Sequence, residues 1–197
     1  MSSRSSLRQG IRLKRRQLNT HERQLAAKQL TERLIRSPLF LNSQRIAAYL
    51  PVQGEIDPTP LIEKAWKMHK QIYLPVLSPI KKNTLWFVRY EPNSRMTKNR
   101  LGIPEPVINH RHRIPTKALD IVLTPLVGFD KHGNRLGMGG GYYDRSFSFL
   151  ASRRYYLKPR LIGLAYEFQQ VPELIKEAWD IPLDAIVTEN KFTHFKK

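Results

Sequence analysis

The sequence predicts an α/β protein with a three-layer α/β/α architecture, in which helices cover both faces of a central, mostly parallel (mixed), Rossmann-like sheet. Two observations support this fold class. Short apolar runs alternate with amphipathic segments along the chain, which is typical of strands that alternate with helices. Some of these runs lack polar alternation, as expected for strands covered on both faces. A length of 197 residues suits one domain, so we expect a single domain over residues 1–197.

The strands are expected at the apolar runs, and a turn at residues 81–83 indicates that one of them is added as a hairpin strand. The run that ends at Val127 is expected to be central. The predicted strands cover residues 46–50, 72–76, 85–90, 120–127, 161–166 and 185–188.

Helical spacing predicts a first helix over residues 4–18. Asn19 is expected to cap the start of a second helix, which ends before Pro38. A third helix is expected to begin with Thr59 as its N-cap, and a fourth to cover residues 142–150. The side chains expected on the buried sides of the second and third helices are Leu25, Leu30, Leu34, Ile35, Leu61, Ile62, Ala65, Trp66 and Met68.

Charge is the unusual feature of the composition. Lys and Arg number 34 against 16 Asp and Glu, a formal net charge of +18, and such a field attracts polyanions such as nucleic acid, nucleotides or multiply charged small molecules. The sequence has no cysteine, which excludes disulfides, thiolate metal sites and a cysteine nucleophile and is compatible with a reducing cytoplasm. No stretch is apolar for long enough to cross a bilayer.

The most informative stretch is residues 135–144, Arg-Leu-Gly-Met-Gly-Gly-Gly-Tyr-Tyr-Asp, which follows a predicted strand and precedes a predicted helix. Glycines allow positive φ and a close approach of backbone to a ligand, and a helix N-terminus attracts anions, so this order favours a phosphate-binding loop. Neither a Walker A loop nor the dinucleotide fingerprint fits, because no Gly-Lys-Ser/Thr follows and Tyr142 stands where a last glycine would be. A tight turn with close packing is the alternative.

Basic residues also crowd one side of the first predicted helix: Arg4, Arg8, Arg12, Arg15 and Arg16. Like charges four residues apart oppose a helix by a few tenths of a kcal/mol each, and an anion against that face would remove the cost. A solvated basic face explains the pattern equally well. The same segment is acid-free, as transit peptides often are, but we favour a native helix.

Two other segments are candidates for a site. Glu55 follows the first strand, where ligands bind in open α/β sheets, although an exposed loop acid is the ordinary alternative. Residues 91–117 show little periodicity and are expected to form a long surface loop; whether it closes over the site stays open. Its His110 and His112 stand among arginines, which is a poor environment for a dication, so no metal site is expected there.

Residues 135–144, together with residues 124–130, resemble the signature of the 5-formyltetrahydrofolate cyclo-ligase (methenyltetrahydrofolate synthetase) family. Three further segments resemble the family in order and spacing, so that nearly the whole chain is covered: Ser6–Arg8, Gly54–Ile56 and Trp179–Leu183. The resemblance implies a three-layer α/β/α enzyme that uses ATP and Mg²⁺ to convert 5-formyltetrahydrofolate to 5,10-methenyltetrahydrofolate, with release of ADP and phosphate. The partners that we expect are small molecules, namely ATP and a folate that can carry more than one glutamate, and we expect a monomer without nucleic acid or membrane.

The resemblance also implies roles for single residues. Leu50 and Glu55 would contact the folate, as would the glycine stretch with Tyr142, and Asp144 and Asp180 would serve the magnesium. Some members carry Lys where this chain has Gly140, so Arg135 or Arg145 is expected to neutralise the phosphates here. The residues implied to contact ATP are Arg4, Arg8, Arg135, Leu136, Gly137, Met138, Gly139, Gly140, Gly141, Tyr142 and Tyr143.

The mechanism that we expect is phosphorylation of the formyl oxygen, followed by attack of the folate N10 and departure of phosphate. The protein then has to align the γ-phosphoryl group and offset its charge. Two rivals remain: a nucleic-acid-binding module, argued from charge alone, and a sugar-phosphate isomerase or transferase on a similar sheet, since fold does not fix chemistry.

Overall fold

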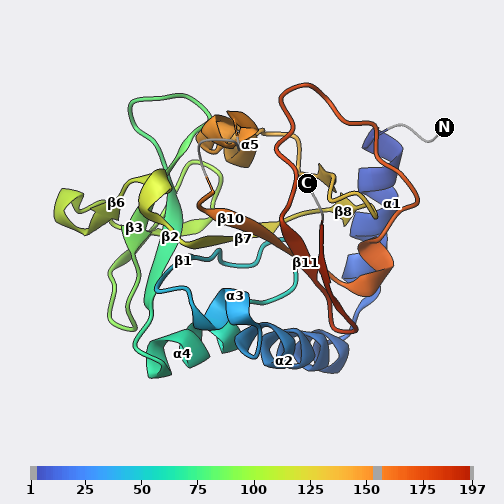
Figure 1. Cartoon of the computed structure of the whole chain (residues 1–197), viewed down its shortest axis with the longest axis horizontal. Helices are drawn as coiled ribbons and strands as arrows, with labels where there is room; N and C mark the ends of the chain where they lie inside the picture. Colours follow the sequence, from blue (N-terminus) through green and yellow to red (C-terminus); the bar gives the residue numbers. More distant parts are fainter. Residues whose placement is uncertain (1–3, 153–156, 196–197) are drawn as a thin grey trace.

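A computed structural model describes residues 4–152 and 157–195. Its centre is an eight-stranded sheet with the order β12-β11-β10-β7-β1-β2-β3-β6 (Figure 1). The strands of this sheet are β1 Arg45–Ala47, β2 Gln71–Leu77, β3 Leu85–Arg89, β6 Arg113–Ile114, β7 Ile121–Pro125, β10 Arg160–Leu164, β11 Ala185–Val187 and β12 Phe192–His194.

The five inner strands β11, β10, β7, β1 and β2 are mutually parallel, and β12, β3 and β6 add antiparallel edges. The α/β class with a mostly parallel, mixed sheet is therefore confirmed, as is the hairpin strand after β2. The sequence did not predict β6 or β12, because two or three edge residues are too few to show a period.

Helices lie on both sides of the sheet. The bounds are α1 Arg4–Gln17, α2 Thr20–Ile35, α3 Pro38–Leu41, α4 Thr59–Lys67 and α5 Tyr142–Ser146, with 3₁₀ turns η1 His110–His112, η2 Thr116–Ala118, η3 Ser148–Ser152 and η4 Glu167–Gln169. Helices α2, α3 and α4 cover the lower face in Figure 1, α5 lies over the upper face, and α1 stands at the right beside the short strand β8 Gly128–Phe129. No helix in the described ranges is long and apolar enough to span a bilayer.

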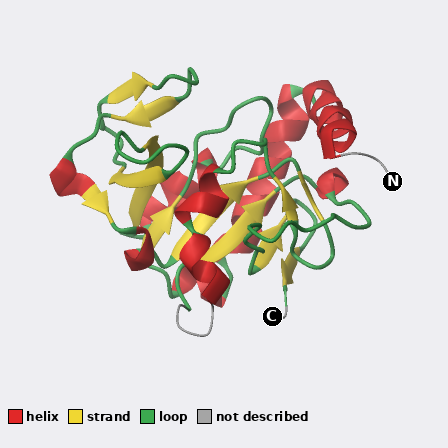
Figure 2. Ribbon diagram, turned by 90° about the horizontal axis from the view of Figure 1, so that it is seen from above, coloured by secondary structure: helices red, strands yellow, loops and turns green. Residues whose placement is uncertain are grey.

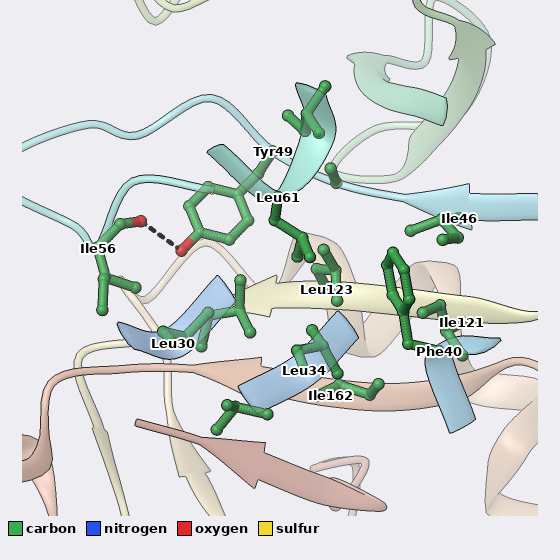
Figure 3. Close-up of a cluster of buried hydrophobic side chains, with 14 of the residues drawn as sticks. Leu30, Leu34, Phe40, Ile46, Tyr49, Ile56, Leu61, Ile121, Leu123 and Ile162 are labelled. Atoms are coloured by element: carbon green, nitrogen blue, oxygen red, sulfur yellow. Dashed lines mark hydrogen bonds between the residues drawn. The ribbon is translucent and has the colours of Figure 1, made fainter. Parts of the chain in front are cut away.

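The core follows from the alternation of side chains along the strands. One face packs against α2 and α4, with Leu30, Leu34 and Leu61 meeting Ile121 and Ile162 (Figure 3). The other face carries Val122 and Leu161 beneath Phe147, next to α5. A third, smaller cluster joins Ile11 of α1 to Val127 and Leu136, so apolar packing holds α1 beside the glycine segment.

Three local predictions differ from the structure. The predicted helix over residues 142–150 is the short α5 followed by η3, because Phe147 leaves α geometry. Helix α4 has Pro58, not Thr59, at its N-cap position, and the Asp57 carboxylate accepts from the Thr59 N–H instead. Leu25 and Met68 are exposed rather than buried.

The predicted surface loop over residues 91–117 is not structureless. It contains the two-stranded ribbon of β4 Met96–Lys98 and β5 Pro104–Pro106, which stands apart from the main sheet (Figure 2), and then η1, β6 and η2. Prolines at both ends of β5 hid the strand from its sequence pattern. The ribbon is fastened to the end of β2, because the Glu105 carboxylate accepts from the Leu77 N–H at 3.0 Å.

Candidate functional site

The glycine segment lies between a short hairpin and α5. Strands β8 Gly128–Phe129 and β9 Arg135–Leu136 pair directly after β7, and residues 137–141 lead from β9 into α5. Gly139 has φ of 104° and Gly141 of 64°, a backbone region that favours glycine. A Cβ built at Gly137 or Gly139 would meet no heavy atom within 4 Å. The loop backbone therefore faces open space, as a ligand cradle requires.

Helix α1 presents a column of arginines to this loop. The Arg8 Nε donates to the Gly137 carbonyl at 2.8 Å, the Arg12 Nη2 lies 3.3 Å from the Met138 sulfur, and the Arg4 Nη2 forms an ion pair with Asp180 at 2.7 Å. Spacing by four residues places the three side chains on one helix face. The structure thus brings the predicted Arg8, together with Arg12, to the predicted loop, and it brings Arg4 to the predicted metal ligand Asp180.

The two predicted metal ligands lie in neighbouring segments. The Asp144 Oδ1 accepts from the Arg135 Nη2 at 2.6 Å and from the Ile181 N–H at 3.1 Å, and the Arg135 Nη1 donates to the Ile181 carbonyl. Because Ile181 follows Asp180, the aspartates belong to one hydrogen-bonded cluster. The buried Arg135 guanidinium is committed to this cluster and does not face open space.

The aspartates suit only a metal that brings other ligands with it. The described ranges contain no group of three or more His, Cys, Asp or Glu arranged to hold an ion. The Asp180 Oδ2 accepts from Arg4 and from the Glu177 N–H, which leaves one oxygen of each aspartate without a hydrogen bond inside the described residues. Two such oxygens match magnesium, which usually takes one or two carboxylates plus phosphate oxygens and water.

The loop after β1 forms a second, buried part of the candidate site. Glu55 is only 6% exposed, and its Oε2 accepts from the Val52 N–H at 3.1 Å. Burial raises the pKa of the Glu55 carboxyl to about 7, against the opposing effects of that N–H and of Arg15 and Arg12. The Tyr49 hydroxyl donates to the Ile56 carbonyl and so holds both ends of this loop together (Figure 3).

Arg15 is a buried arginine of α1 whose position the sequence did not reveal. It is fully buried, and its Nη1 donates to the Leu126 carbonyl at 3.4 Å, while Nε and Nη2 have no hydrogen-bond partner among the described residues. Burial lowers the pKa of the Arg15 guanidinium, and the negative charge of Glu55 acts in the opposite direction. The only sequence signal was its place on the arginine-rich side of α1, and that signal does not distinguish a buried arginine from an exposed one.

The remaining predicted residues surround the same region. Leu50 is half-buried against the core of the lower face. Tyr142 and Tyr143 are half-buried, and the Tyr142 hydroxyl accepts from the Arg100 guanidinium at 3.1 Å. Arg145 is exposed, and its Nη1 donates to the Gly140 carbonyl at 2.7 Å. The arginine at 145 therefore lies against the glycine loop, whereas Arg100 is a contact that the sequence did not suggest.

Comparisons with known proteins decide the family. The model of the 5-formyltetrahydrofolate cyclo-ligase family matches residues 1–189. The chain belongs to this family. It is 42% identical to the 5-formyltetrahydrofolate cyclo-ligase of Escherichia coli K12 over 181 residues, which cover 92% of this chain and 97% of that protein. Identity to the Haemophilus influenzae cyclo-ligase is also 42%, with 89% and 94% covered.

Solved structures of family members share the fold. The 5,10-methenyltetrahydrofolate synthetase of Aquifex aeolicus superimposes with a TM-score of 0.81 at 34% identity, covering 98% of this chain and 93% of the other. The synthetase of Mycoplasma pneumoniae gives a TM-score of 0.74 at 25% identity, with 95% and 99% covered. The family resemblance of the glycine–tyrosine segment is thus confirmed, and the protein is a ligase of the cyclo-ligase type.

Proposed function

We propose that this protein converts 5-formyltetrahydrofolate to 5,10-methenyltetrahydrofolate with conversion of ATP to ADP and phosphate, the formyl oxygen leaving in that phosphate, and that it does so at the edge formed by α1, residues 137–141 and Glu55. The observation that carries the proposal is that Arg8 and Arg12 contact an open glycine backbone, while Arg4 contacts one of the two aspartates beside it. Cations and free backbone N–H groups at one place suit a triphosphate.

In this proposal the glycine segment and the arginines bind the phosphates. The N–H groups of residues 137–141 and the side chains of Arg8 and Arg12 offset the charge of the transferring group, which is the main task in phosphoryl transfer. Arg145, which donates to the Gly140 carbonyl, also offsets the charge of the transferring group. Arg135 has a different role: it holds Asp144 in position through the ion pair.

Magnesium bound to Asp144 and Asp180 would offset phosphate charge, as divalent ions do in such sites. Glu55 and Leu50 are proposed to hold the pterin, with Glu55 able to exchange a proton near neutral pH. The fixed loops align the formyl oxygen with the γ-phosphoryl group, so that the oxygen becomes a leaving group when N10 attacks. We further propose that the protein is a cytoplasmic monomer that needs no nucleic acid.

One assay tests the proposal. Purified protein is mixed with 5-formyltetrahydrofolate, ATP and magnesium, and the near-UV absorbance of the methenyl product is followed. Product should form only when ATP and magnesium are both present, with one phosphate released for each product molecule. Formation of product without ATP, or none under any of these conditions, would refute the proposed reaction.

A further inference from the structure

The ribbon β4–β5 and the turn between β2 and β3 border a shallow, open cavity that the proposed reaction leaves unassigned. Its volume is about 470 Å³, and it is lined by residues 77–80, Lys82, Asn99, Arg100 and Glu105. Cavities of small-molecule sites start at about 300 Å³, so this one is large enough for part of a ligand. It opens at the end of β2, and because β1 and β2 are parallel, this is the same edge of the sheet as the Glu55 loop.

A hydrogen bond connects the cavity to the proposed site. Arg100 lines the cavity, and its guanidinium donates to the Tyr142 hydroxyl at 3.1 Å. Tyr142 is the first residue of α5, directly after the glycine segment, and burial, together with the Glu55 carboxylate, raises the pKa of the neighbouring Tyr143 hydroxyl. The Arg100–Tyr142 hydrogen bond therefore joins the cavity to the start of α5 and so to the end of the glycine segment.

The chemistry of the lining favours an anion. Lys82 and Arg100 are exposed cations, and Lys82 forms no ion pair within the described residues. The Ser78 hydroxyl oxygen accepts from the Ile80 and Lys81 N–H groups, which leaves its own hydrogen available to a ligand.

The acid in the lining is already engaged. The Glu105 Oε2 accepts from the Leu77 N–H at 3.0 Å and from the Asn99 side chain at 2.9 Å, and the residue is only 8% exposed. Glu105 thus holds the ribbon against β2. The charge at the opening of the cavity is therefore determined by Lys82 and Arg100. Ile80, which is 83% exposed, adds an apolar side chain to the same wall. An anion attached to an apolar ring would satisfy both features.

We propose that this cavity binds the glutamyl end of the folate, with Lys82 and Arg100 contacting its carboxylates and Ile80 contacting the aminobenzoyl ring. The inference rests on the proposed function, because it takes the substrate from there. It adds a second anchor to the substrate: the pterin is held at Glu55, and the dianionic end is held by the cavity at the same edge of the sheet.

The test compares two substrates: 5-formyltetrahydrofolate and 5-formyltetrahydropteroate, which lacks the glutamate. Turnover is followed by the absorbance of the methenyl product, and equilibrium binding of each substrate is measured by calorimetry without ATP. The variants are Lys82→Gln, Arg100→Gln and the pair together, and Lys67→Gln on the exposed side of α4 is the control for loss of one positive charge.

The parent protein should bind the glutamate-bearing substrate more tightly than the pteroate. Each variant should raise KM and Kd for that substrate about threefold, and the pair about tenfold, as expected for exposed charge-assisted contacts. Kinetics with the pteroate and the KM for ATP should stay within about twofold, and Lys67→Gln should change nothing. Raising the salt concentration should reduce the difference between the substrates.

Three results would overturn the inference: equal affinity of the parent for both substrates, variants that weaken both substrates alike, or variants that raise the KM for ATP instead. The last result would assign the cations to the nucleotide. If no substrate is turned over, the proposed reaction fails, and the calorimetric comparison of the two substrates still decides whether the cavity recognises the glutamyl end.

Discussion

The glycine loop and the Glu55 loop lie at the same edge of the sheet but are built in opposite ways. At the glycine loop the carboxylates are matched by arginines, because Arg4 pairs with Asp180 and the buried Arg135 pairs with Asp144. At the Glu55 loop the charges are buried and unmatched: Glu55 accepts only from the Val52 N–H among the described residues, and two nitrogens of Arg15 have no partner there.

This difference indicates different tasks for the two loops. Matched charges around an open backbone can exchange their partners for a polyanion and a metal with little reorganisation. Buried, unmatched groups carry a desolvation cost that is tolerated where a site needs a shifted pKa. We therefore expect substitutions at the glycine loop to affect nucleotide use, and substitutions at the Glu55 loop to affect pH dependence and folate use.

The largest effect is expected for Asp144→Asn. Loss of the carboxylate should lower kcat by about a thousandfold, because metal-assisted charge stabilisation contributes several kcal/mol. It should also lower the free energy of unfolding by about 1–3 kcal/mol, since Arg135 would lose its partner. Turnover is measured across a magnesium titration, and unfolding in urea.

A matched control is available at Asp120, which pairs with Lys158 at 2.7 Å and also accepts from the Gln44 and Arg45 N–H groups at the far end of β1. Asp120→Asn should destabilise the fold without an effect on kcat. Near-parental turnover of Asp144→Asn at limiting magnesium would exclude the metal role of Asp144.

The second effect concerns pH. The Glu55 carboxyl has its pKa raised to about 7 from an ordinary value of 4.5, so the folded protein binds this proton more tightly than the unfolded chain does. The resulting stability is fully present below pH 4.5 and is lost as the pH rises through 7, in total about 3 kcal/mol. Glu55→Gln should remove this loss and unfold at higher urea than the parent at pH 8. The urea midpoints of both proteins at pH 5 and pH 8 check this, and equal pH dependence would contradict it.

A smaller effect is expected on the nucleotide side for Arg8→Gln. The side chain should lose a charge-assisted contact with the phosphates, and the KM for ATP should rise about tenfold with little change in the KM for folate. Arg16→Gln provides the control, since Arg16 is exposed on the same helix. A KM for ATP that stays at the parental value would remove Arg8 from the nucleotide site.

The smallest effect separates ligand contact from backbone strain. Gly137 lacks positive φ, and a Cβ there meets nothing within 4 Å, whereas Gly139 has φ of 104°. Gly137→Ala should leave the free energy of unfolding within about 0.5 kcal/mol and yet raise the KM for ATP about threefold, because the methyl group enters the ligand space. Gly139→Ala should lower both stability and ATP use. If Gly137→Ala binds ATP normally, the open side of the loop does not face the nucleotide.

The sequence predicted the strand–helix alternation, the inner strands and the position of the glycine loop, because each rests on a local pattern of apolar or glycine residues. It also placed Arg4 and Arg8 on one helix face. It could not separate the buried Arg15 from the exposed Arg16, since burial of an arginine is decided by the loop packed over it: a Cβ at Gly54 would lie 3.4 Å from the Arg15 carbonyl oxygen. The commitment of Arg135 to Asp144 and the contact of Arg100 with Tyr142 depend on distant segments and left no local signal.

The central claim is that residues 137–141 hold the triphosphate and that Asp144 and Asp180 hold the divalent ion. A crystal structure with a non-hydrolysable ATP analogue and Mn²⁺, with the metal located by its anomalous scattering, tests both parts together. The account predicts phosphate oxygens against the loop N–H groups and a manganese peak between the two aspartates. A nucleotide bound at another edge of the sheet, or a metal that contacts neither aspartate, would contradict it.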